Sequence, residues 1–154
     1  MIQCINILLE HNFACREPLL NALKQLTKEE FTQNLQVGRG SIRDIMVHLM
    51  KTELYWISVV SDQEMKPISD EDFTDVDVIR KTWQEIESST RNFVENQSES
   101  SLQYVKNVTW GEQTVSFTMA KAIIHMATHE THHRGLIIGL MKQLGHEPPD
   151  VNMM

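Results

Sequence analysis

MAKAIIHMATHETHHRGLIIGLMKQL, residues 119–144, decides the fold, because its apolar side chains repeat with the period of a helix packed on other helices. A row at intervals of seven residues runs through Met119, Met126, His133 and Leu140. Gly145 is the expected residue just past the helix end, and Pro148 and Pro149 prevent continuation. The sequence therefore predicts a final helix over this range, with a histidine on its interior face.

Three further helical patterns precede this one, separated by turn signals. We expect these helices over about residues 2–26, 42–60 and 76–96. Pro18 predicts a kink or a new turn within the first helix, and Ser41 is the expected N-cap of the second. Thr27 and Glu30 form a capping box that predicts a short extra turn. The alternation around Gly111 over residues 102–117 predicts a short hairpin or extended connection before the last helix.

Composition and charge limit the class of protein. The 154 residues, 41% of them hydrophobic, match one globular domain over 1–154, and long helices with little strand predict an all-α four-helix bundle. A formal charge of −7 without a Lys/Arg run repels phosphate and anionic lipid, so we expect no nucleic-acid and no membrane partner. No apolar run reaches the length of about 18 residues that a membrane span needs, and no signal peptide is evident, which predicts a cytoplasmic protein.

The histidines suggest a metal site. His129 and His133 are one helical turn apart, with Cβ atoms about 5–6 Å apart, so both rings can bind one ion. On the second helix, His48 lies on the interior side beside a row of seven-spaced residues. Burying three unpaired imidazoles is costly, whereas a divalent cation uses all three lone pairs. Three nitrogen ligands would leave coordination positions open for water or substrate.

Other interpretations of these residues stay open. A single interior histidine such as His48 is usually a hydrogen-bonded core residue, and the pair on the last helix can be a chance spacing. H-E-x-x-H from His129 to His133 also matches zinc hydrolases, in which Glu130 would be the general base. Such enzymes draw a third ligand from downstream, where only His146 follows. A metal-dependent hydrolase and a non-catalytic metal or small-molecule binding protein therefore remain alternatives.

The side chains near these histidines have weaker predicted roles. Glu53 is expected either to orient an imidazole or to be solvated, and Arg134 to pair with Glu130 one turn away. His125 and His132 fall on the edge of the apolar stripe, where they are exposed or act as a proton shuttle. We expect the three tryptophans to serve core or hairpin packing, and Cys4 and Cys15 to be free thiols.

Four segments carry a resemblance to a known family. They are IRDIMVHLMKTELYWI (42–57), WGEQTVSFTMAKAIIHM (110–126), HETHHRG (129–135) and LGHEPPD (144–150). In this combination the sequence resembles the DinB/YfiT-like family of bacterial metal-binding four-helix bundles over essentially the whole chain. The family's metal triad falls on His48, His129 and His133, the same residues that the helical spacing selects.

The resemblance implies an up-down-down-up bundle, a homodimer, and a divalent metal such as zinc or nickel. It also implies a thiol S-transferase of bacterial detoxification or stress response, in which a low-molecular-weight thiol such as bacillithiol is transferred to a small electrophile. A metal ion lowers the pKa of a bound thiol and so supplies a thiolate at neutral pH. Leu136 stands where the family often has glutamine, so a polar contact from that position is missing here.

Overall fold

The helices of the computed structural model, which describes residues 1–153, lie where apolar periodicity and capping residues place them. The elements are α1 (Ile2–Leu23), α2 (Lys28–Thr32), α3 (Ile42–Ser61), α4 (Val76–Glu95), β1 (Val105–Trp110), β2 (Gln113–Thr118) and α5 (Met119–Gln143). The strands pair antiparallel around a tight turn, and Gly111 takes the left-handed conformation that this turn requires, with φ 60°. The predicted helical fold with a hairpin before the last helix is confirmed.

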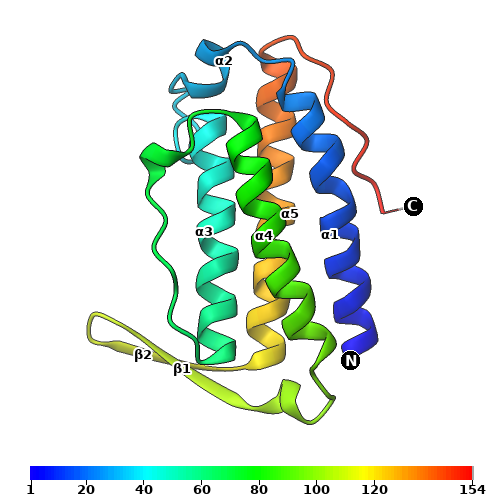
Figure 1. The fold of residues 1–154 in the computed structure, drawn as a ribbon, viewed down its shortest axis with the longest axis vertical. Coiled ribbons are helices and arrows are strands. Elements are labelled where there is room, and N and C mark those ends of the chain that lie inside the picture. Colours follow the sequence, from blue (N-terminus) through cyan, green and yellow to red (C-terminus); the bar gives the residue numbers. More distant parts are fainter. Residues whose placement is uncertain (154) are drawn as a thin grey trace.

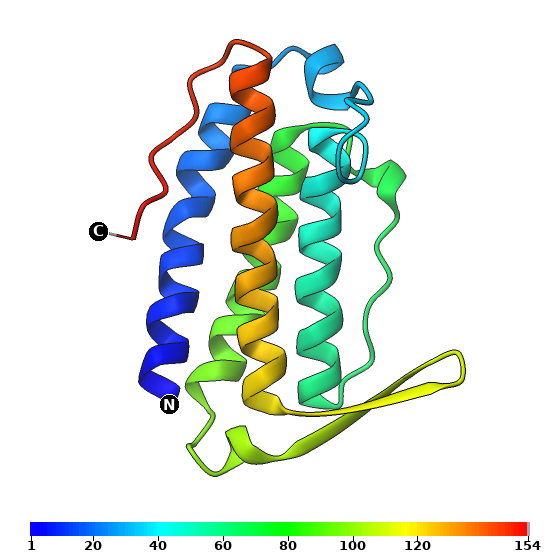
Figure 2. The same cartoon turned by 180° about the vertical axis from the view of Figure 1, so that it is seen from behind.

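The four long helices form an up-down-down-up bundle (Figure 1). Helices α1 and α5 run in one direction, and α3 and α4 run in the other, as both views show (Figures 1 and 2). Each long helix packs on two neighbours: α3 contacts α4 and α5, and α1 contacts the same two helices. Because α3 and α4 are parallel, residues 62–75 must run back along the whole length of the bundle (Figure 1). None of the described helices is both long and apolar enough to cross a membrane.

Capping side chains fix the starts of α2 and α3 as predicted. The Ser41 hydroxyl accepts a hydrogen bond from the Asp44 amide at 3.0 Å, and Thr27 and Glu30 form the expected capping box of α2. Asp75 caps α4 by accepting hydrogen bonds from two backbone amides. Helix α1 continues through Pro18 and ends at Leu23, three residues earlier than predicted, because the chain must turn before the α2 cap.

A polar layer divides the interior into two apolar clusters. One cluster lies around the first half of α3 and the second half of α5, and the other around the opposite halves of these helices. Between them lie six buried polar side chains, at least one from each long helix: Asn12, Arg16, Glu53, Thr90, Glu130 and Arg134. A buried polar group is tolerated only when it is hydrogen-bonded. The layer therefore demands a closed set of partners.

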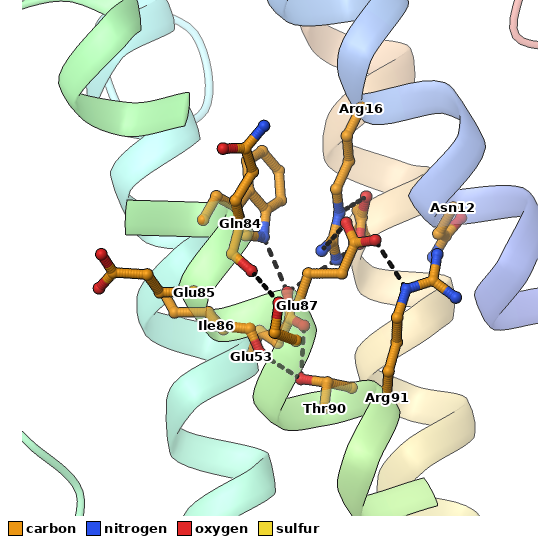
Figure 3. Close-up of polar contacts among 12 residues, drawn as sticks. Asn12, Arg16, Glu53, Gln84, Glu85, Ile86, Glu87, Thr90 and Arg91 are labelled. Atoms are coloured by element: carbon orange, nitrogen blue, oxygen red, sulfur yellow. Dashed lines mark hydrogen bonds and ion pairs between the residues drawn. The ribbon is translucent and has the colours of Figure 1, made fainter. Parts of the chain in front are cut away.

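Arg16 supplies most of those partners. Its guanidinium donates to both carboxylate oxygens of Glu130, at 3.0 and 2.6 Å, and to Glu53 Oε2 at 2.7 Å. Glu53 also accepts from Trp83 Nε1 at 2.8 Å and from Thr90 Oγ1 at 2.7 Å, while Glu87 contacts Arg16 from α4. Figure 3 shows Arg16, Glu53 and Thr90 meeting between three helices. We call this set, with Trp83, Glu87 and Glu130, the Arg16 network.

Candidate metal centre

Three histidines meet at the interface between α3 and α5. His48 Nε2 lies 3.1 Å from His129 Nε2, and the ring of His133 is centred 5.0 Å from that of His48 and 4.5 Å from that of His129. One nitrogen from each ring lies within 4.8 Å of the others. Zinc–nitrogen bonds of about 2.1 Å separate tetrahedral ligands by about 3.4 Å, so small side-chain movements suffice to surround one ion. The structure thus brings together the three histidines that the sequence selects.

The environment keeps these rings in the form that binds metals. Burial, together with the charge of Arg39 and the nearby His133, lowers the pKa of His48 to about 4. Burial and the neighbouring histidines lower the pKa of His129 to about 4, and burial followed by His132 and Arg39 lowers the pKa of His133. At neutral pH the three imidazoles are therefore uncharged and offer lone pairs.

The hydrogen bonding of the rings argues against ordinary core histidines. The Nδ1 atoms of His129 and His133 are buried and have no hydrogen-bond partner among residues 1–153, so no carbonyl or carboxylate of the described chain holds these rings through that atom. Three neutral nitrogen donors without a thiolate or carboxylate match the preferences of zinc and nickel. The residues present therefore fit a divalent metal ion.

The remaining histidines of α5 stay outside the triad. His125 and His132 are exposed, as predicted for the edge of the stripe, and neither belongs to the group whose nitrogens converge. The His132 ring lies 5.0 Å from that of His133, and the His125 ring packs against Trp56 at 5.2 Å. These two residues therefore surround the centre without completing it.

The acidic neighbours differ from the prediction. Glu53 neither orients His48 nor is solvated, because it is 2% exposed and bound within the Arg16 network. Arg134 does lie 3.8 Å from Glu130 as predicted, but it donates more closely, at 3.0 Å, to Asn12. Glu130 is held by Arg16 of α1, on a different side of α5 from the triad. A zincin-like general base would have to reach the metal-bound water, so this geometry disfavours that role.

We predict that Glu130→Gln leaves the metal content of the protein unchanged and lowers the free energy of unfolding by about 1–3 kcal/mol, since one charge-assisted contact to Arg16 is lost. Elemental analysis of the dialysed protein measures the metal content. Urea unfolding, followed by circular dichroism, measures the free energy of unfolding. A metal content that falls with this substitution would instead place Glu130 at the centre.

An open cleft leads to the centre. Its volume is about 640 Å³, and α3, α5, the connection after α3 and the hairpin all contribute to its walls. The lining residues include His48, His129, Arg39, Tyr55, Trp56 and Trp110. Trp56 and Trp110 thus border the cleft, whereas Trp83 is a core residue in the Arg16 network. Arg39 was not singled out by sequence, because it lies in a glycine-containing loop without periodicity.

A four-helix bundle with three converging histidines beside an open cleft defines the class of protein as a helical bundle with a candidate metal centre. The chain belongs to the DinB family, which it matches over residues 1–154. It is 26% identical over 148 residues to Protein DinB of Bacillus subtilis (strain 168), covering 90% of this chain and 85% of that protein.

Solved structures show the same fold. A DinB-like protein from Bacillus cereus ATCC 10987 is similar with a TM-score of 0.71 at 16% identity, over 94% of this chain and 95% of that one. A DinB-like protein from Bacillus subtilis gives a TM-score of 0.68 at 16% identity, over 94% and 97%. Family membership and the histidine cluster together support a metal-binding DinB-like protein.

Proposed function

We propose that the protein is a divalent-metal-dependent thiol S-transferase in which His48, His129 and His133 hold zinc or nickel. The observation that carries the proposal is the convergence of three neutral imidazoles from two helices, of which His48 and His129 line an open cleft. A site built to stabilise the fold would be closed by a fourth protein ligand, whereas an open position admits an exogenous one. The triad therefore suits catalysis better than structure.

The thiol must come from a small molecule. Cys4 is exposed at the start of α1, and Cys15 is buried beside His11, where burial raises the pKa of its thiol. Neither cysteine lines the cleft. A metal ion in the triad would lower the pKa of a bound thiol, and the apolar part of the cleft wall, such as Trp56 and Trp110, would shield the resulting thiolate from water. A low-molecular-weight thiol such as bacillithiol and a small electrophile are the proposed substrates, with detoxification as the proposed role.

Cobalt substitution tests the thiol step directly. Cobalt-loaded protein titrated with bacillithiol is expected to develop a sulfur-to-cobalt charge-transfer band in the near ultraviolet, which metal-free protein cannot show. Zinc-loaded protein should then accelerate attack of the thiol on monobromobimane, in which a carbon–sulfur bond forms as bromide leaves. Absence of the band would refute thiol coordination. A band without acceleration would make the protein a metal and thiol binding protein without turnover.

We also propose the homodimer that the family resemblance implies. Light scattering of the purified protein in solution should then report the mass of two chains. A mass of one chain at micromolar concentration would refute this assembly.

A further inference from the structure

The charged side chains around the cleft leave one positive charge without a partner. Arg39 and Lys51 line the cleft, whereas no acidic residue does, although the chain has 21 acidic and 14 basic residues. Lys51 is neutralised by Asp70. A second hollow adjoins the cleft, and its two acids are Asp70 and Asp44. Asp44 is paired with Arg43. Arg39 has no carboxylate within salt-bridge distance among residues 1–153, so the unpaired cation of the cleft is Arg39.

The loop between α2 and α3 holds this arginine over the triad. Gly38 and Gly40 flank it with φ values of 60° and 103°, and the Val37–Gly40 bridge tightens the turn. A Cβ atom on Gly38 would lie 2.6 Å from Leu136 Cδ2, so the loop is packed closely on α5. Arg39 Nη2 lies 3.3 Å from His48 Nε2, the nitrogen that faces His129. Arg39 is exposed to solvent, yet this contact directs its guanidinium at the centre.

A metal ion in the triad would place two positive charges, the ion and the Arg39 guanidinium, side by side without an anion between them. The three neutral imidazoles bring no negative charge, so a divalent cation and the Arg39 guanidinium would repel each other across a few ångströms. An anionic group between them would remove the repulsion and would accept charge-assisted hydrogen bonds from the guanidinium fork. No acid lines the cleft, and the two acids that share the adjoining hollow with Arg39, Asp44 and Asp70, are already paired with Arg43 and Lys51, so a ligand is the source of an anion that fits this position.

The other wall of the cleft is aromatic. Trp56 and Trp110 meet edge to face at 6.3 Å, and Trp110 Nε1 donates to the Tyr55 hydroxyl at 3.0 Å. Trp110 remains 50% exposed, so a large apolar surface faces the opening. Met65 and Pro67 from the connection after α3 add apolar area. Such a surface favours a flat or apolar body over a hydrated one.

We infer that the cleft selects an organic anion, with its carboxylate or similar anionic group at Arg39 and its apolar or aromatic body against Trp56 and Trp110. This inference rests on the proposed function, because it names the class of small molecule that reaches the triad. The charge of the cleft lining disfavours cationic substrates, because a cation would face Arg39 without an acid in the lining to compensate.

Three probes with the same aryl body and different charge test the inference: 3-phenylpropionate, 3-phenylpropanamide and 3-phenylpropylammonium. Each is titrated into zinc-loaded and metal-free protein while the three tryptophan indole N–H signals are followed by NMR. Trp56 and Trp110 line the cleft, and Trp83 is bonded to Glu53 in the core, so it serves as the internal control. Only the indole signals of Trp56 and Trp110 are expected to shift.

In zinc-loaded and in metal-free protein alike, 3-phenylpropionate is expected to bind about tenfold more tightly than 3-phenylpropanamide. The ammonium probe should bind more weakly than either. Arg39→Gln should remove this preference in metal-free protein. Lys66→Gln, which removes an exposed charge near the cleft rim, should retain it. Equal affinities for carboxylate and amide, no binding of the carboxylate, or an unchanged preference in Arg39→Gln would overturn the inference. Failure to load zinc would refute the proposed function alone, since the metal-free titration still decides the role of Arg39.

Discussion

His48→Ala protein is expected to retain less than about one tenth of the metal that the wild-type protein holds after exhaustive dialysis. The substitution removes the only ligand from α3 and leaves two histidines of one helix turn on α5. Loss of a group that merely orients a ligand weakens metal binding about 10- to 100-fold, and loss of a ligand itself should cost at least about 100-fold. Elemental mass spectrometry of tag-free protein, reloaded with zinc or nickel and dialysed, measures the effect.

His132→Ala provides the matched control. This residue is exposed, lies next to His133 on the same helix, and contributes no nitrogen to the triad. The variant should hold about one ion per chain, as the wild type should. Zinc should also raise the unfolding midpoint of wild type and of His132→Ala but not that of His48→Ala, because a ligand stabilises only the form that binds it. A wild type that takes up no metal would make these histidines ordinary core residues.

Arg16→Leu is expected to lower the free energy of unfolding by about 3–5 kcal/mol. The substitution leaves the carboxylates of Glu53 and Glu130 buried without their cation, at 2% and 7% exposure. Because a domain is stable by only about 5–15 kcal/mol, a large part of its stability depends on this one side chain. Urea unfolding followed by circular dichroism gives the difference.

Two further variants separate charge from packing. Adding Glu53→Gln and Glu130→Gln to Arg16→Leu removes both uncompensated charges, so most of the lost stability should return. Arg43→Leu breaks a pair with Asp44 that is far more exposed than the Arg16 network, with side-chain exposures of 27% and 38%, and should cost less than about 1 kcal/mol. If the triple variant were no more stable than Arg16→Leu, the loss would lie in packing instead of unpaired charge.

The effect of Arg16→Leu should also depend on pH. Burial raises the pKa of Glu53, and the charge of Arg16 opposes that rise. Without Arg16 the folded-state pKa rises further above the unfolded value of about 4.3, so folding takes up a proton. The penalty is absent below the unfolded pKa and grows as pH rises through the folded pKa. The stability gap between variant and wild type should therefore be smaller at pH 5 than at pH 8.

The helices and the triad could be predicted because both depend on local spacing. Ser41 begins α3 through a hydrogen bond to a residue three positions away, and His129 and His133 are neighbours on any helix. Placing His48 opposite these two residues also required knowing which face of the second helix points to the interior, and the seven-spaced row of residues supplied it. The end of α1 was missed because the turn before α2, rather than the apolar pattern, decides where that helix ends.

The Arg16 network could not be predicted in the same way, because its bonds join residues far apart in the sequence. A signal was nevertheless present: Asn12 and Arg16 follow Leu9 and precede Leu19 at helical spacing, so two polar residues lie on the buried face of α1. Glu53 lies on the buried face of α3 in the same way. Arg39 carried no such signal, since its position depends on the left-handed glycines beside it.

The dependence on α5 also sets the order of events during synthesis of the chain. Arg16 and Glu130 are separated by 114 residues, and His48 and His129 by 81. A chain emerging from the ribosome carries α1, α3 and α4 before α5 exists, so neither the polar layer nor the triad can close until α5 is made. Any metal ion held by the triad would therefore be captured only after α5 has been made, and until then Arg16 has only its partners on α3 and α4.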